Sequence, residues 1–456
     1  MHWWAVLLIV LGAVVFAAVA TVIAFATIPR VQRLFLLAPL SPPTWVVPIH
    51  NPGRMGLPHA RLVAIPTAGG AAVLRGWHLP PPGPPFPPVP PSPPSTVGTG
   101  RHRPSAAKVV SGPAAVAEAA ALDAHLDMRL ATDGHPAVLY CHGHGGSRGT
   151  PPSRTAWARD VAARAGVHVL SWDPRGYGDT DAWPGGPTEA TLKEDGAAAA
   201  AWLAARLAGE PRPEVGDAAT SAPAASTPAP RPPTISAAAA AAARRRLVVY
   251  GHSAGGSVAL AAASAVPPAG VVLSGAWTCL PDAAAAHPAT APLRAVPGLF
   301  QALQSRVVDH LDNEAALAGV AAPTSHGGQD GSGGGDGVSD GGGRVGGGLA
   351  CPLLLLHNPA DPVMPYAHAL RLRAAAIAGG VPVALVPTPG RGHKAGWRSA
   401  PFFPAFTGWL AEVTAAEGTG REIKGGGGDK GGWRHLVAPL EEEVESKVAE
   451  GGSTAV

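Results

Sequence analysis

The chain opens on a long apolar segment. Trp3 to Ile28 contains no charged side chain, and a helix of that length crosses the ~30 Å hydrocarbon layer of a bilayer. Trp3 and Trp4 stand where aromatic side chains anchor a span at the interface. A cleaved signal peptide is the main alternative, because Ala24-Phe25-Ala26 resembles a cleavage site. However, the apolar run is longer than the usual ~7–15 residues and no basic residues precede it. We expect residues 1–33 to form one uncleaved membrane anchor.

Beyond residue 45, short apolar runs alternate with helical patterns. Leu62 to Leu79 alternates between apolar and polar residues around Gly69-Gly70, as an antiparallel hairpin does. The later alternation of strand and helix is typical of a mainly parallel sheet covered by helices on both faces. We therefore predict one α/β domain over residues 45–415. Its further strands are expected at 137–141, 167–172, 247–250, 271–274, 353–357 and 381–387, and its helices at 114–130, 191–207 and 255–265.

Three segments interrupt this order. Residues 80–104 are proline-rich, 209–241 are rich in Pro, Ala, Ser and Thr, and 325–348 are mostly glycine. All three lack the apolar periodicity that offsets the entropy of ordering a chain, so we expect disordered surface loops. The glycine-rich, charged residues 418–456 are expected to form a flexible tail. Arg244 to Arg246 precede a strand and are interpreted as solvated loop charges.

Composition limits the classes of partner and cofactor. A net charge of +3 with 14% charged residues gives no indication of a nucleic-acid partner. Cys141, Cys279 and Cys351 are scattered without C-x-x-C spacing, which argues against a disulfide framework or a zinc site. We expect Cys141 and Cys351 to pack in the core, and no metal or organic cofactor is expected.

A candidate nucleophile follows an apolar strand. Gly251-His252-Ser253-Ala254-Gly255 is a G-x-S-x-G sequence between the strand 247–250 and a helix of small residues. That strand–turn–helix setting predicts the nucleophile elbow of an α/β-hydrolase fold, with the Ser253 hydroxyl exposed at the sheet edge. The alternative is a tight turn between strand and helix with an incidental serine.

A serine hydroxyl requires a base, and the base requires an orienting acid. In this fold the chain order is serine, then acid, then histidine. Asp361 follows the strand 353–357 and His393 follows the next strand, so both are expected at the same sheet edge as Ser253. His357 is an alternative base, but it precedes Asp361 and lies at a strand end.

An acyl-transfer site also requires backbone donors for the oxyanion. The amide of Ala254, directly after the nucleophile, is one candidate. The other is the amide of His144, in the loop His142-Gly143-His144-Gly145-Gly146 that follows the first buried strand. This loop could also suggest a metal site, but no third or fourth ligand lies nearby in the sequence.

These motifs resemble the membrane-anchored α/β-hydrolase domain-containing subfamily twelve, the lysophosphatidylserine and monoacylglycerol lipase group. The resemblance covers residues from about Pro136 to Leu410 outside the insertions. The ending Gly392-His393-Lys394 is among its more particular features. The insertions have no counterpart, and His144 stands where the family usually has Asn. The segments that carry the resemblance are 135–143, 147–149, 173–179, 187–189, 287–288, 296–300, 351–357, 361–366 and 392–394.

The resemblance implies hydrolysis of single-chain acyl lipids, a short lid over roughly 278–320, and a single-pass protein of the endoplasmic reticulum. By analogy the catalytic domain faces the lumen, whereas Arg30 and Arg33 after the span favour a cytoplasmic position. Asp173 and Arg175 are expected to be structural. The expected partners are a lipid ester and the membrane; the sequence identifies no protein partner.

Other functions stay open at this point. A depalmitoylase-type thioesterase or a general carboxylesterase would share the same triad. A non-catalytic scaffold would be marked by a missing triad residue. The segment 80–104 also leaves open a tethering role as a PxxP ligand.

Overall fold

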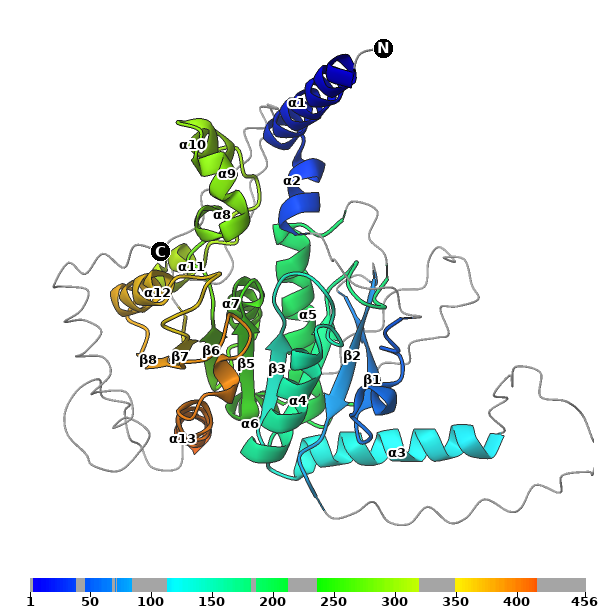
Figure 1. Cartoon of the computed structure of the whole chain (residues 1–456). Helices are drawn as coiled ribbons and strands as arrows, with labels where there is room; N and C mark the ends of the chain where they lie inside the picture. The colour runs from blue at the N-terminus through cyan, green and yellow to red at the C-terminus, as the bar shows by residue number, and fades with distance from the viewer. Residues whose placement is uncertain are drawn as a thin grey trace, which may run out of the picture.

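An eight-stranded, mainly parallel sheet forms the centre of the computed structural model, which describes residues 3–37, 46–67, 70, 72–83, 113–181, 186–211, 236–319 and 349–415. The strand order is β1-β2-β4-β3-β5-β6-β7-β8 (Figure 1). β2 is antiparallel to β1 and to β4, and every other neighbouring pair is parallel. The strands are β1 (Arg61–Pro66), β2 (Val73–Leu79), β3 (Ala137–Cys141), β4 (His168–Asp173), β5 (Leu247–His252), β6 (Gly270–Ser274), β7 (Leu353–His357) and β8 (Val383–Pro387).

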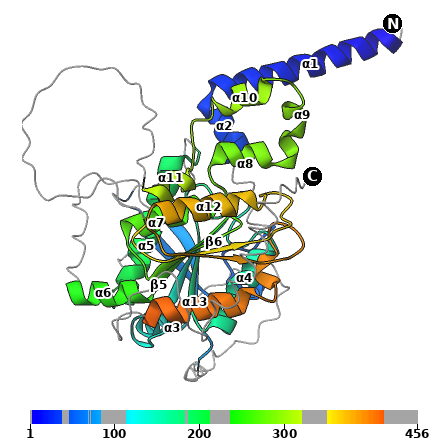
Figure 2. The ribbon, with the colours of Figure 1, turned by 90° about the vertical axis from the view of Figure 1, so that its left-hand side faces the viewer.

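Helices cover both faces of this sheet, and α12 and α13 lie on opposite sides of it (Figure 2). In β3, Leu139 packs with the layer of α5, α7 and α12, whereas Val138 and Tyr140 pack with α4 and α13. Strands buried on both faces must be apolar at every position, which explains their continuous apolar runs. The main helices are α3 (Pro113–Thr132), α4 (Pro152–Ala165), α5 (Glu189–Leu207), α7 (Gly255–Ala265), α12 (Ala367–Ala378) and α13 (Phe402–Ala415).

This arrangement is the α/β-hydrolase fold that the sequence predicted. The predicted hairpin, the parallel strands and the helix after Ser253 are all present. Cys141 and Cys351 are buried in the core as expected, and all three cysteines are free. Helices α4 and α12 were not predicted. Most of the insertion residues and the whole tail, that is 84–104, 212–235, 325–348 and 418–456, lie outside the described residues.

The interpretation of Arg244 to Arg246 as solvated loop charges was wrong about the loop, although Arg244 and Arg245 are exposed as expected. These residues end a helix, α6 (Ala237–Arg246), which also makes the last residues of the segment 209–241 helical. Arg246 donates hydrogen bonds to the carbonyls of Leu130 and Ala131 in the last turn of α3. A cation stabilises the unpaired carbonyls at a helix C-terminus. This partner is remote in sequence, so a local pattern does not reveal it.

The N-terminal apolar segment forms α1 (Trp3–Thr27), followed by α2 (Pro29–Leu36). Ile9 to Thr27 is long and apolar enough to cross a bilayer and is not buried against the rest of the chain; a signal sequence meets the same criteria. The lid helices are α8 (Leu280–Ala286), α9 (Ala291–Arg294), α10 (Leu299–Gln304) and α11 (Asn313–Ala318). α1 and α2 lie beside α8, α9 and α10, above one edge of the sheet, whereas α11 lies against α12 (Figures 1 and 2).

Candidate active site

Ser253 occupies a strained turn between β5 and α7. Its φ is 54°, in the left-handed region that non-glycine residues rarely adopt. The turn is held by a hydrogen bond of 2.9 Å from the Ser253 N–H to the Ser274 carbonyl. A Cβ at Gly251 would lie 2.6 Å from the Gly255 carbonyl oxygen, and one at Gly255 would overlap the carbonyl of Cys141. The two glycines of the motif are therefore required by close backbone packing.

The structure brings Asp361 and His393 together. His393 Nδ1 lies 2.7 Å from Asp361 Oδ2, and the other carboxylate oxygen accepts hydrogen bonds from the N–H groups of Val363 and Met364. Burial favours a higher pKa for Asp361, but the hydrogen bond and charge of His393, together with the two amides, outweigh it and lower the pKa. An ionised Asp361 therefore orients the imidazole and fixes its tautomer, which leaves Nε2 as the proton acceptor.

Ser253 and His393 both lie next to the C-terminal end of β6, at the C-terminal edge of the sheet. The N–H of Ser253 bonds to Ser274, and a Cβ on the next residue, Gly275, would lie 3.2 Å from His393 Cε1. The His252 and His393 rings have centroids 5.1 Å apart. Within the described residues, no hydrogen bond joins Ser253 Oγ to His393. Such bonds are often long in ligand-free hydrolases and shorten when substrate binds.

The loop after β3 lies against Ser253. A Cβ at Gly143 would lie 3.0 Å from the Ser253 Cβ, so a larger residue here would have to push the two apart by a few tenths of an ångström. The amide of His144 belongs to this loop, and the amide of Ala254 belongs to the first turn of α7. Burial, and then the charge of Arg154, lower the pKa of the His144 imidazole, which is therefore neutral at pH 7. Among the described residues, no group of three metal-ligating side chains forms around this loop.

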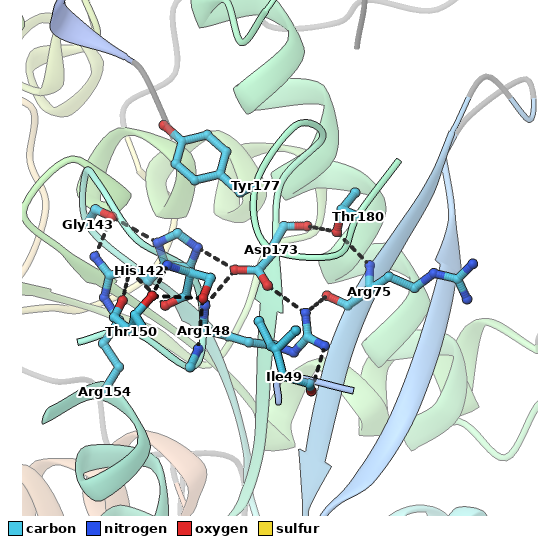
Figure 3. Close-up of polar contacts among 12 residues, drawn as sticks. Ile49, Arg75, His142, Gly143, Arg148, Thr150, Arg154, Asp173, Tyr177 and Thr180 are labelled. Atoms are coloured by element: carbon cyan, nitrogen blue, oxygen red, sulfur yellow. Dashed lines mark hydrogen bonds and ion pairs between the residues drawn. The ribbon is translucent and has the colours of Figure 1, made fainter. Parts of the chain in front are cut away.

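A buried ionic network fixes the other side of the loop (Figure 3). Asp173 Oδ1 lies 2.9 Å from His142 Nε2 and 2.6 Å from the backbone nitrogen of Arg148, and Asp173 Oδ2 pairs with the Arg148 guanidinium. Arg148 also pairs with Asp179. Burial favours a higher pKa for Asp173, but the positive charge of Arg148 outweighs it and lowers the pKa. Asp173 is thus structural, as expected, and so is Arg175, which pairs with Asp195.

Two residues of the site were missed by sequence reasoning. Asn358 Nδ2 donates to the carbonyls of Gly390 and Gly392, which ties the loop that carries Asp361 to the loop that carries His393. Arg154 lines a small cavity of about 30 Å³ together with His393 and other residues of the site. Neither side chain belongs to a motif, so the only signal was the proximity of Asn358 to Asp361. His357, the alternative base, is buried and bonds through Nε2 to the Met364 carbonyl.

Comparison with known proteins gives one partial sequence match and several distant structural ones. No family model matches the chain. A stretch of 94 residues is 32% identical to the lysophosphatidylserine lipase ABHD12 of Danio rerio, and this match covers 21% of the chain and 23% of that protein. An esterase of Pyrococcus furiosus superposes with a TM-score of 0.44 at 12% identity, over 83% of this chain and 96% of the other. For a puromycin-hydrolyzing peptidase of Mycobacterium tuberculosis, the TM-score is 0.40 at 16% identity, over 80% of this chain and 40% of the other.

Proposed function

We propose that this protein is a membrane-anchored serine hydrolase that cleaves acyl esters of single-chain lipids, lysophospholipids or monoacylglycerols. The observation that carries the proposal is the grouping at one sheet edge of Ser253, in a strained turn, with a hydrogen-bonded pair of His393 and Asp361. Each of these residues follows a different strand, and all three occur in the chain order that the fold requires.

The proposed reaction is acyl transfer. His393 Nε2 takes the proton of Ser253 Oγ as that oxygen forms a bond to the ester carbonyl carbon, and the carbonyl π electrons move onto oxygen. The amides of His144 and Ala254 stabilise this oxyanion. When the intermediate collapses, the bond to the leaving alcohol breaks and His393 returns the proton to it. Water then attacks the acyl-enzyme, with the same base, to release the fatty acid and restore Ser253.

The lipid class is supported by the partial match to a lysophosphatidylserine lipase and by the position of the lid. Gln32, which is buried, donates from Nε2 to the Arg306 carbonyl and accepts at Oε1 from the N–H of Val308. Arg33 pairs with Asp309 at 2.6 Å. α2, which directly follows the apolar N-terminal helix, is thus fastened to the lid. In this proposal an acyl chain enters beside the lid, next to the bilayer that α1 would span.

Few charges bear on membrane orientation. The positive-inside rule counts Lys and Arg within about 20 residues of a span, and acidic residues contribute little to it. Arg30 and Arg33 are the two such residues that follow the apolar segment. The bias toward a cytoplasmic domain is therefore weak. We propose a single-pass protein of the endoplasmic reticulum with its catalytic domain in the lumen. Glycosylation of an acceptor site engineered into an exposed loop would support this orientation, and an unmodified site would contradict it.

The proposed activity is tested by fatty-acid release from a panel of lysophospholipids, monoacylglycerols, short esters and acyl thioesters. Detergent-solubilised full-length protein is compared with Ser253→Ala, in which release should fall by about 10⁴-fold or more. Ser264→Ala is the matched control, because Ser264 lies exposed in α7 and, among the described residues, its hydroxyl bonds only to the Leu260 carbonyl.

The ranking of substrates decides the finer assignment. Highest release from lysophospholipids or monoacylglycerols would support the lipase, and a preference for thioesters or short esters would favour the depalmitoylase or carboxylesterase alternatives. Folded protein that releases no more fatty acid than Ser253→Ala from any substrate would reject the enzymatic proposal.

A further inference from the structure

Arg154 lies in the first turn of α4, directly behind the loop that faces Ser253. Its side chain is buried, and its guanidinium donates to four backbone carbonyls of that loop. Nη1 bonds to Ser147 at 2.8 Å and to Thr150 at 2.7 Å, and Nη2 bonds to Gly143 at 2.7 Å and to His144 at 3.2 Å. Figure 3 shows Arg154 beside Gly143 and Thr150. One side chain thus fixes the course of the whole turn after β3.

These bonds determine which way the loop amides point. In a trans peptide the C=O and the following N–H point in opposite directions. Because the carbonyl of Gly143 is turned to the guanidinium, the N–H of His144 points away from Arg154. The same holds for the carbonyl of His144 and the N–H of Gly145. Gly143 is in contact with Ser253, so the N–H groups of His144 and Gly145, which point away from Arg154, belong to the part of the loop next to Ser253.

Arg154 also differs from its buried neighbours in its charge balance. Arg148 pairs with Asp173 and Asp179, and Arg175 pairs with Asp195. In the part of the chain that the structure describes, Arg154 pairs with no carboxylate and bonds only to neutral carbonyls. Its positive charge is therefore not cancelled by a contacting anion.

The effect of this charge reaches the groups around the nucleophile. Burial lowers the pKa of His252, and the charges of His393 and then Arg154 lower it further. Burial followed by Arg154 lowers the pKa of Lys394 in the same way. The small cavity of about 30 Å³ is lined by all four of these side chains, Arg154, His252, His393 and Lys394. The region next to Ser253 thus disfavours additional positive charge and favours an anion.

We infer that Arg154 is a positioning residue for acyl transfer: it holds the carbonyls of the loop away from Ser253, directs the amide of His144 to the oxyanion, and supplies an uncancelled positive charge. The inference rests on the proposed function, because it requires an oxyanion to form at a Ser253 adduct. It assigns Arg154 no contact with the substrate.

The test compares two substitutions that differ in charge. Arg154→Lys keeps the charge but reaches fewer carbonyls, and Arg154→Gln loses the charge but can still donate a hydrogen bond. We expect kcat to fall in the order unsubstituted, Lys, Gln, with a loss for Gln of about 10²–10³-fold, as for removal of an oxyanion donor. KM should change by less than about threefold, because the lost stabilisation belongs to the transition state.

Arg159→Gln is the matched control. Arg159 lies in the same helix, its side chain is 55% exposed and it pairs only with the adjacent Asp160 in the described region. This variant should keep the unsubstituted kcat. All rates are normalised to folded protein, measured by circular dichroism and thermal unfolding. Equal kcat per folded molecule in Arg154→Lys, Arg154→Gln and unsubstituted protein would overturn the inference, as would a loss confined to KM.

A fluorophosphonate probe separates this inference from the choice of substrate. The probe phosphonylates an activated serine, and its P=O oxygen occupies the position of the oxyanion. Labelling of Ser253 that is slowed in Arg154→Gln supports the inference even if no lipid is hydrolysed, in which case only the lipid substrate is rejected. Labelling at an unchanged rate in Arg154→Gln overturns the inference alone. Absence of labelling in the unsubstituted protein overturns it together with the role of Ser253.

Discussion

Besides His142 and Asp173, the sheet carries two further hydrogen-bonded pairs of histidine and aspartate, one at each edge. At the C-terminal edge, His393 Nδ1 lies 2.7 Å from Asp361. At the opposite edge, where β4 begins, His168 Nε2 lies 3.0 Å from Asp133. Both contacts are hydrogen bonds of similar length between the same two residue types, so the pair by itself does not distinguish a catalytic site from a structural one.

The difference lies at the second ring nitrogen. His168 Nδ1 lies 2.9 Å from His78 Nε2, so both of its nitrogens are engaged. In the described structure, His393 Nε2 has no hydrogen-bond partner. His168 is also completely buried, whereas the His393 side chain keeps 9% of its surface exposed. A base must have a free nitrogen that the reacting proton can reach, and only His393 meets this condition.

The two aspartates also differ in their hydrogen-bond and ion-pair partners. Asp133 is approached at 3.4 Å by Arg246 of α6, which ties the end of α3 to a separate element, and at 3.6 Å by Arg129 of α3 itself. Asp361 is held by two backbone amides of its own turn. Asp133 joins separate elements, as residues that stabilise a fold do. Asp361 is held by its own turn through one carboxylate oxygen, which leaves the other oxygen available to orient His393. The comparison therefore predicts loss of activity at one edge and loss of stability at the other.

The largest expected effect is on catalysis by the histidines. His393→Ala should lower kcat for ester hydrolysis by about 10⁴-fold or more, because in the proposed mechanism His393 takes the Ser253 proton. His168→Ala should leave kcat per folded molecule within about threefold of the unsubstituted value. Fatty-acid release normalised to folded protein measures both. A similar loss of kcat in the two variants would show that the distinction between the edges is wrong.

The aspartates should separate activity from stability. Asp361→Asn should lower kcat by about 10⁴-fold, since a neutral amide favours the wrong tautomer of His393, with a small change in Tm. Asp133→Asn should lower the free energy of unfolding by about 1–3 kcal/mol, because it weakens buried and half-buried hydrogen bonds, with kcat unchanged. Kinetics and denaturant unfolding of both variants provide the measurement, and the reverse pattern would contradict the assignment.

The smallest effect is on the pH dependence of stability. Burial lowers the pKa of His168 below its ordinary value of 6.5, and the hydrogen bond to Asp133 only partly offsets this. The folded state thus binds fewer protons than the unfolded state, so stability is full above pH 6.5 and is lost as pH falls below it, by at most about 1.4 kcal/mol per pH unit for one group.

His168→Gln removes this titration. We expect urea unfolding between pH 7.5 and 5 to show a shallower loss of stability in this variant than in the unsubstituted protein. Asp361 affects stability in a different, more acidic pH range. Because its pKa is lowered, its contribution to stability is lost only as pH falls below its ordinary value of 3.8. An Asp361→Asn variant should therefore keep the unsubstituted slope between pH 7.5 and 5, and a changed slope there would contradict this account.

Much of the fold was predictable from the sequence because its signals are local. Strands buried on both faces read as continuous apolar runs, and β3 and β7 begin and end at the residues expected from those runs. The elbow was also predictable, since Gly251 and Gly255 are required by backbone contacts within one strand–turn–helix unit. α4 was not, because Arg154 and Thr155 are buried by partners outside that helix and interrupt an apolar stripe.

What the sequence determined by itself is the order of strands and helices, the apolar N-terminal helix, and the positions of Ser253, Asp361 and His393 after successive strands. Only the tertiary structure decided how their surroundings differ. The sequence places a histidine at each edge of the sheet but does not show that His78 occupies one nitrogen of His168. Nor does it show that Arg154 donates hydrogen bonds to the carbonyls of the loop beside Ser253, or that Gln32 fastens α2 to the lid. Each of these contacts joins residues distant in sequence, and their hydrogen bonds are formed only once packing brings the elements together.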